Sequence, residues 1–201
     1  MFDDLNDRLG WSKVQLPRNE VILIKDSLES EGNFLLTNFI ALFLAGESRV
    51  ITVGLQHTVA HYYSCCRKLG VNLRTAQRAG RFVFIDAATR MFDQQTIDIP
   101  EIRELPTTVP VVFDSNSPEE SLKKLFLSIA ANGNTADDIP CCVVIDCLSE
   151  LGSFCSKELI ADFAHYCRTL TASKVNNNLH MRKWFTYETL EAGFFNNINA
   201  W

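Results

Sequence analysis

The chain has 201 residues, of which 47% are apolar and 21% are charged, and its formal net charge is −5. This composition is typical of one compact globular domain and excludes a disordered or fibrous chain. The acidic balance argues against a protein that coats nucleic acid, because such proteins neutralise many phosphates, and it leaves a local RNA contact open.

In chain order, runs of β-branched residues alternate with segments of helical periodicity. Runs without polar alternation predict strands buried on both faces of a parallel sheet at 21–24, 49–55, 81–86 and 141–146. Helical spacing covers 34–45, 59–69, 118–131 and 156–170. Pro118 and the two glutamates after it favour a helix start, because proline tolerates the first turn and carboxylates complement the helix dipole. The alternation predicts an α/β layered fold with right-handed crossovers.

Two segments break this alternation. Residues 87–117 contain three prolines among polar residues and are too long for an ordinary connection, so we expect an excursion available for contacts, with a short strand at VPVVF. After Thr171, six aromatic residues fall within 184–201, so we expect this tail to pack on the body or to dock on a partner. We therefore divide the chain into a domain at 1–171 and an aromatic-rich tail at 172–201.

The cysteines and the chain ends indicate the compartment. The seven cysteines contain no CxxC pair, which argues against a zinc knuckle or a redox motif and favours small buried side chains in a reducing compartment. The acidic N-terminus lacks the features of a signal peptide, and the longest apolar run, FIALFLAG, is too short to cross a membrane. We expect a cytoplasmic chain without metal or membrane contact, with nuclear access open.

The segment DSLESEG lies where a phosphate-binding loop would connect the first strand to the first helix. Such a loop needs two glycines, a lysine that contacts the transferred phosphate and a hydroxyl that binds magnesium. When Gly32 is aligned with the second glycine, Ser27 replaces the first, Asn33 replaces the lysine and Phe34 replaces the hydroxyl. Only one of the four requirements is met.

Two further positions of a nucleotide site can be recognised in the sequence. One carries an altered residue, and the other has two possible interpretations. Gln56 follows the second strand where a catalytic glutamate is expected, and an amide cannot accept a proton. Asp146 ends the fourth strand, where it either assists a metal, as in a Walker B strand, or has a purely structural role. Because the lysine, the hydroxyl and the base are absent together, we expect negligible ATP hydrolysis and no cofactor, with weak anion binding at the helix N-terminus left open.

The order of these pieces resembles subunit 6 of the Elongator complex, a family of RecA-like proteins without ATPase signatures. The resemblance covers about residues 1–170 and rests on HYYSCCRKLGVNL, on FVFIDA and on the degenerate phosphate loop. It implies a RecA-like P-loop NTPase fold, three-layered with a mostly parallel sheet, and degenerate Walker motifs. It also implies a heterohexameric ring with Elongator subunits 4 and 5, two copies of each, which contacts the Elongator catalytic core, binds tRNA and supports wobble uridine (U34) modification.

The chain departs from this family near its end, where further strands of the RecA-like sheet are expected. Here the sequence continues into asparagines and the aromatic tail. One interpretation is an alternative C-terminus that leaves the sheet without its last strands and with an unpaired edge.

Other groupings have both a functional and a structural interpretation. His57 and His61 are four residues apart, which suits a metal on one helix face, but no third ligand is near. His165 and Cys167 are two residues apart, so their side chains point apart on a helix, which disfavours a nucleophilic pair. The densest basic cluster is either a solvated face or a contact with tRNA or a neighbouring subunit, and its candidate residues are Arg67, Arg74, Arg78 and Arg81.

Two alternative functions stay open at this point. The first is a RecA-like ATPase that binds nucleotide at an unorthodox site, for which Lys25 is the nearest candidate cation. The second is a Rossmann-type methyltransferase, which is disfavoured because the turn after the first strand holds a single glycine.

Overall fold

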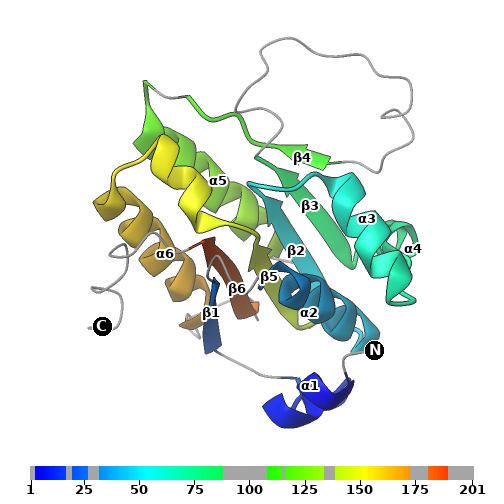
Figure 1. The fold of residues 1–201 in the computed structure, drawn as a ribbon. Helices are drawn as coiled ribbons and strands as arrows, with labels where there is room; N and C mark the ends of the chain where they lie inside the picture. Colours follow the sequence, from blue (N-terminus) through cyan, green and yellow to red (C-terminus); the bar gives the residue numbers. More distant parts are fainter. Residues whose placement is uncertain are drawn as a thin grey trace.

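The computed structural model describes residues 3–16, 20–26, 32–87, 108–114, 116–133, 139–172 and 181–189. Within these ranges the centre is a six-stranded sheet in the order β1-β6-β5-β2-β3-β4, and every neighbouring pair is parallel (Figure 1). The strands are β1 (Glu20–Asp26), β2 (Arg49–Gly54), β3 (Phe82–Asp86), β4 (Thr108–Pro110), β5 (Cys141–Ile145) and β6 (Met181–Thr189). The predicted α/β fold with a mostly parallel sheet is confirmed.

Helices cover both faces of this sheet. The described helices are α1 (Asp3–Leu9), α2 (Asn33–Ala45), α3 (Val59–Lys68), α4 (Leu73–Arg78), α5 (Pro118–Gly133), the 3-10 helix η2 (Leu148–Ser153) and α6 (Lys157–Ala172). One core lies between the sheet and α2, α3 and α4, and the other between the sheet and α5, η2 and α6. The protein therefore has three layers.

The alternation of side chains along the strands supplies both cores. Ile51 of β2 and Val143 of β5 belong to the core under α5 and α6, whereas Val50 and Val144, one residue away, belong to the core under α2 to α4. Successive residues of a strand point to opposite faces, so a strand covered on both sides needs apolar residues throughout. This is why these runs lack polar alternation.

The four predicted helices are confirmed with ends that differ by at most two residues, whereas α1, α4 and η2 were not predicted. The signal for α4 is Asn72, whose Oδ1 accepts hydrogen bonds from the backbone N–H groups of Arg74 at 3.0 Å and Thr75 at 3.3 Å. Helix α2 has no polar face, and residues 36–44 are all buried beneath its neighbours. A helix that is apolar all round is expected to be covered in this way.

Strand β6 comes from the segment that the sequence indicated as a tail. It pairs with β1 on one side and β5 on the other, so residues 181–189 lie inside the sheet. The division of the chain at residue 171 and the absence of the last strands stay predictions. In the described part of the chain, β1 is paired on one side only. A short strand is present near the predicted VPVVF, but β4 ends at Pro110 and shares only Val109 and Pro110 with it. Most of the excursion, residues 88–107, lies outside the described residues.

Candidate functional site

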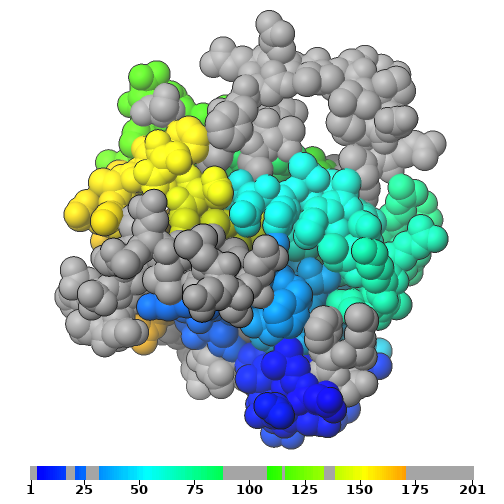
Figure 2. Space-filling view, viewed as in Figure 1, coloured from blue at the N-terminus to red at the C-terminus, as the bar shows by residue number. Residues whose placement is uncertain are grey.

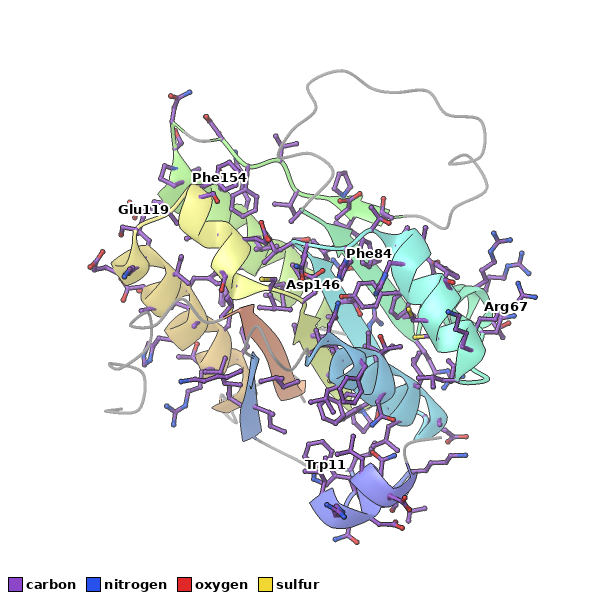
Figure 3. All side chains as sticks on the ribbon, in the orientation of Figure 1. Trp11, Arg67, Phe84, Glu119, Asp146 and Phe154 are labelled. Atoms are coloured by element: carbon purple, nitrogen blue, oxygen red, sulfur yellow. The ribbon has the colours of Figure 1, made fainter. Side chains whose placement is uncertain are left out.

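The degenerate nucleotide positions lie at the carboxyl edge of the sheet, where open α/β sheets bind their ligands. Helix α2 begins there at Asn33, residues 55–58 connect β2 to α3, and Asp146 directly follows β5. Figure 3 shows Asp146 near the centre of the molecule, between the end of β5 and the start of α3. The structure therefore brings Asn33, Gln56 and Asp146 into one region, whereas Ser27 lies outside the described residues.

Asp146 is fully buried, and both of its carboxylate oxygens accept hydrogen bonds from the segment after β2. Oδ1 accepts from the backbone N–H of Leu55 at 2.6 Å and of Gln56 at 3.1 Å, and Oδ2 accepts from the backbone N–H of His57 at 2.9 Å. The hydroxyl of Tyr62, a fully buried residue of α3, also donates to Oδ2 at 3.2 Å. The carboxylate therefore fixes the path of the chain from β2 into α3.

The buried environment of Asp146 disfavours the charged form of its carboxyl group. Burial raises the pKa of this carboxyl group from 3.8 to about 6, and the backbone and Tyr62 hydrogen bonds oppose that rise. A metal ion could use this carboxylate only by displacing hydrogen bonds that hold the loop after β2. The geometry gives Asp146 a structural role.

Asn33, at the position of the phosphate-loop lysine, contacts His57 instead of solvent. Its side-chain amide lies in hydrogen-bonding contact with Nε2 of His57. The His57 ring stacks on that of His61, with centroids 4.1 Å apart. Burial lowers the pKa of both histidines, and His57 and Lys68 lower that of His61 further. This pair is therefore neutral near pH 7 and supplies no positive charge for a phosphate.

The structure also places the remaining positions of the candidate nucleotide site. Phe34, at the position of the metal-binding hydroxyl, is about half exposed at 49%. Gly32 is the N-cap residue of α2 with φ −97°, a conformation that any residue adopts, so the glycine is not needed for a strained turn. Gln56 is exposed and contributes its backbone N–H to Asp146. Lys25 is exposed on β1.

The basic cluster divides into two groups. Arg81 is half-buried, and its Nη1 donates to the carbonyl of Leu44 at the end of α2 at 3.0 Å, which gives it a structural role. Arg67, Arg74 and Arg78 are exposed on α3 and α4. Arg67 and Arg74 line a cleft between these two helices.

Other side chains that the sequence singled out do not form a reactive centre. His165 is exposed whereas Cys167 is buried, and burial raises the pKa of the Cys167 thiol well above its ordinary value. None of the seven cysteines forms a disulfide bond, and six of them are buried. Among the described residues, no group of three or more histidine, cysteine or acidic side chains is arranged to hold a metal ion.

Sequence reasoning missed the contacts that connect these positions. Neither the bonds from residues 55–57 to Asp146 nor the contribution of Tyr62 has a local sequence signal, because the partners are 84 to 91 residues apart. The amide–imidazole contact between Asn33 and His57 likewise joins residues 24 positions apart.

The fold and the site together define a three-layer α/β protein, with helices on both faces of one parallel sheet. At the carboxyl edge of this sheet, Asp146 holds the loop after β2 through hydrogen bonds. The chain belongs to the family described as Elongation complex protein 6, whose sequence pattern matches residues 2–189. This match extends past the expected limit near residue 170 and includes β6.

Individual relatives carry the name Elongator complex protein 6. The protein from Xenopus tropicalis is 31% identical over 181 residues, which cover 89% of this chain and 66% of the relative. The Xenopus laevis protein is 32% identical over 181 residues, and the Homo sapiens protein is 25% identical over 185 residues; both matches cover 89% of this chain and 67% of the relative. The chain thus spans about two thirds of the length of these relatives.

None of the helices in the described ranges combines the length and the apolar character needed to cross a bilayer.

Proposed function

We propose that this chain is a noncatalytic subunit of the Elongator complex, with a RecA-like P-loop NTPase fold and degenerate Walker motifs. Family membership supports a place in that complex. The observation that carries the noncatalytic role is the engagement of Asp146 by three backbone N–H groups and the Tyr62 hydroxyl, beside an uncharged Asn33–His57 pair. A phosphoryl transfer site needs a cation and a metal ligand at these positions.

The proposed assembly is a heterohexameric ring of this chain with Elongator subunits 4 and 5, two copies of each. The ring would contact the Elongator catalytic core, bind tRNA and support wobble uridine (U34) modification. Support comes from the sequence resemblance and from the free edge of β1 within the described residues, where Val21 is 46% exposed. An unpaired strand edge is a surface that other chains can cover.

Co-expression of this chain with subunits 4 and 5 tests the assembly. Native mass spectrometry of the purified complex should give two copies of each chain, and labelled tRNA should bind the complex more tightly than any subunit alone. Recovery of subunits 4 and 5 without this chain, under conditions in which all three are expressed, would contradict the proposal.

The noncatalytic role has a separate test against the competing ATPase function. Titration of the purified chain with a fluorescent ATP analogue should show weak binding or none, and phosphate release from ATP should stay at the rate of a buffer blank. Steady phosphate release that is lost on the substitution Asn33→Ala would establish an unorthodox ATPase instead.

The remaining parts of the proposal concern location and contacts. We place the chain in the cytoplasm, with nuclear access left open. The seven cysteines, none of which forms a disulfide bond, support this placement because reducing compartments keep thiols from forming disulfides. We assign the exposed Arg67, Arg74 and Arg78 to contacts with other components of the assembly.

A further inference from the structure

Helices α3 and α4 enclose a surface cleft of about 690 Å3. One wall is a face of α3 made by Ala60, Tyr63, Ser64 and Arg67, which follow one another at the spacing of a single helical face. The opposite wall is the turn 70–72 and the start of α4. Ala60 and Ser64 are small and exposed, so the groove stays open between the two helices. Figure 2 shows α3 and α4, in cyan to blue-green, at the surface of the molecule.

The charged residues of α3, α4 and the turn between them are all basic. Between Glu47 and Asp86 the sequence contains no acidic residue and six basic residues, although the whole chain has a net charge of −5. Four of these cations are exposed on α3 and α4: Arg67, Lys68, Arg74 and Arg78. None of the described residues that line the cleft is acidic. A one-sign surface of this kind attracts a partner of opposite charge and speeds its association.

The lining favours a peptide over a nucleic acid base. Among the described residues of the lining, the only aromatic ring is that of Tyr63, whose hydroxyl donates to Oε1 of Gln77 at 2.7 Å. The guanidinium of Arg74 already lies over this ring, 6.0 Å from its centroid, so that face is not open for base stacking. The half-buried Val71 and the exposed Ala60 instead offer apolar atoms at the surface.

We propose that the α3–α4 cleft binds an acidic segment of a partner protein. An apolar side chain of that segment would lie over Ala60 and Val71, while its carboxylates pair with Arg67 at one side and Arg74 at the other. Guanidinium groups suit this task because they bind carboxylates through two parallel hydrogen bonds. Arg67 and Arg74 of the basic cluster would then contact protein. The natural source of the segment rests on the proposed function, whereas the binding step does not.

The test uses the purified full chain and a fluorescein-labelled dodecapeptide, EELLEELLEELL, followed by fluorescence anisotropy. The peptide should bind the natural chain, and Arg67→Glu combined with Arg74→Glu should weaken binding about tenfold or more at low salt. Added salt should weaken binding to the natural chain. The matched control is Lys13→Glu with Lys124→Glu, which makes the same charge change at exposed positions outside the cleft and should leave affinity within about twofold.

A second variant tests the cleft without a change of charge. Ser64→Trp places a large ring in the groove and should also weaken peptide binding, while circular dichroism confirms that each variant stays folded. This variant also keeps the test decisive if the double arginine variant fails to fold. The peptide EESSEESSEESS, which keeps the carboxylates and lacks the leucines, should bind more weakly than EELLEELLEELL.

The outcomes that overturn the proposal are equally specific. One is that EELLEELLEELL does not bind the natural chain, and another is that all variants bind it equally. A third is that the cleft variants lose as much affinity for fluorescein-labelled oligouridylate as they lose for the peptide. The last result would make the cleft an RNA site. Because no other subunit is present, failure of ring assembly counts against the proposed function alone and leaves this measurement intact.

Discussion

Replacement of Asp146 by asparagine should change how the stability of the protein depends on pH. The substitution Asp146→Asn keeps the shape of the side chain and removes its titration, so a comparison of the two proteins isolates the contribution of one buried carboxyl group. In the natural protein, burial raises the pKa of Asp146 to about 6, from an ordinary value of 3.8.

The size and sign of the effect follow from proton binding. Between the two pKa values the folded state retains a proton that the unfolded chain has released, so stability decreases as the pH rises from about 4 through the folded value near 6. Because a tenfold change in a proton-binding constant is worth about 1.4 kcal/mol, the contribution is about 2 to 3 kcal/mol. His57 and His61, whose pKa values are lowered, act in the opposite direction below about pH 6.5 and are present in both proteins.

Urea denaturation followed by circular dichroism, repeated between about pH 4 and pH 7.5, measures this contribution. The free energy of unfolding of the Asp146→Asn variant, relative to the natural protein, should rise by about 2 to 3 kcal/mol across that range. The exposed Asp114, changed to asparagine, controls for the loss of one carboxyl group. A relative stability that stays constant within about 0.5 kcal/mol would refute the assignment of a buried, titrating carboxylate.

Three further substitutions test the site and the packing around it. Asn33→Lys should produce no steady phosphate release from ATP, because the carboxylate after β5 stays bound to the loop after β2; sustained release would contradict this. Gly54→Ala should lower the free energy of unfolding by about 2 to 3 kcal/mol, since its Cβ would overlap the Phe84 ring, and an unchanged urea midpoint would argue against that packing. Arg81→Ala should cost about 1 to 2 kcal/mol through the lost bond to the end of α2, whereas the exposed Arg78→Ala should stay within about 0.5 kcal/mol; equal losses would remove the distinction.

The elements that could be predicted are those whose burial produces a recognisable pattern of apolar residues along the chain. The strands β2 and β5 lack polar alternation because both of their faces are covered, and α5 begins at Pro118 with two glutamates in its first turn. Short helices were missed because six or seven residues make only about two turns and carry little periodic signal. The Asn72 cap of α4 was present in the sequence and would have indicated that helix.

Strand β6 could not be placed from its own residues. Its aromatic and threonine content, in MRKWFTYET, favours a strand, but the same content was interpreted as a tail because a polar asparagine run precedes it. The site shows the same limit. The sequence identified Asn33, Gln56 and Asp146 as altered positions, but it could not show that Asp146 binds the loop after β2, since those partners meet only through the sheet.

The position of β6 has a consequence for how the protein is made. In the described part of the chain, β1 has no partner in the sheet except β6, which is synthesised more than 150 residues later. During translation, the residues of β1 therefore lack the strand with which their backbone N–H and C=O groups pair until almost all of the described chain has been synthesised. Such long-range strand pairing is slow and leaves aggregation-prone strand edges exposed. Newly synthesised chains should therefore depend on chaperones during this interval.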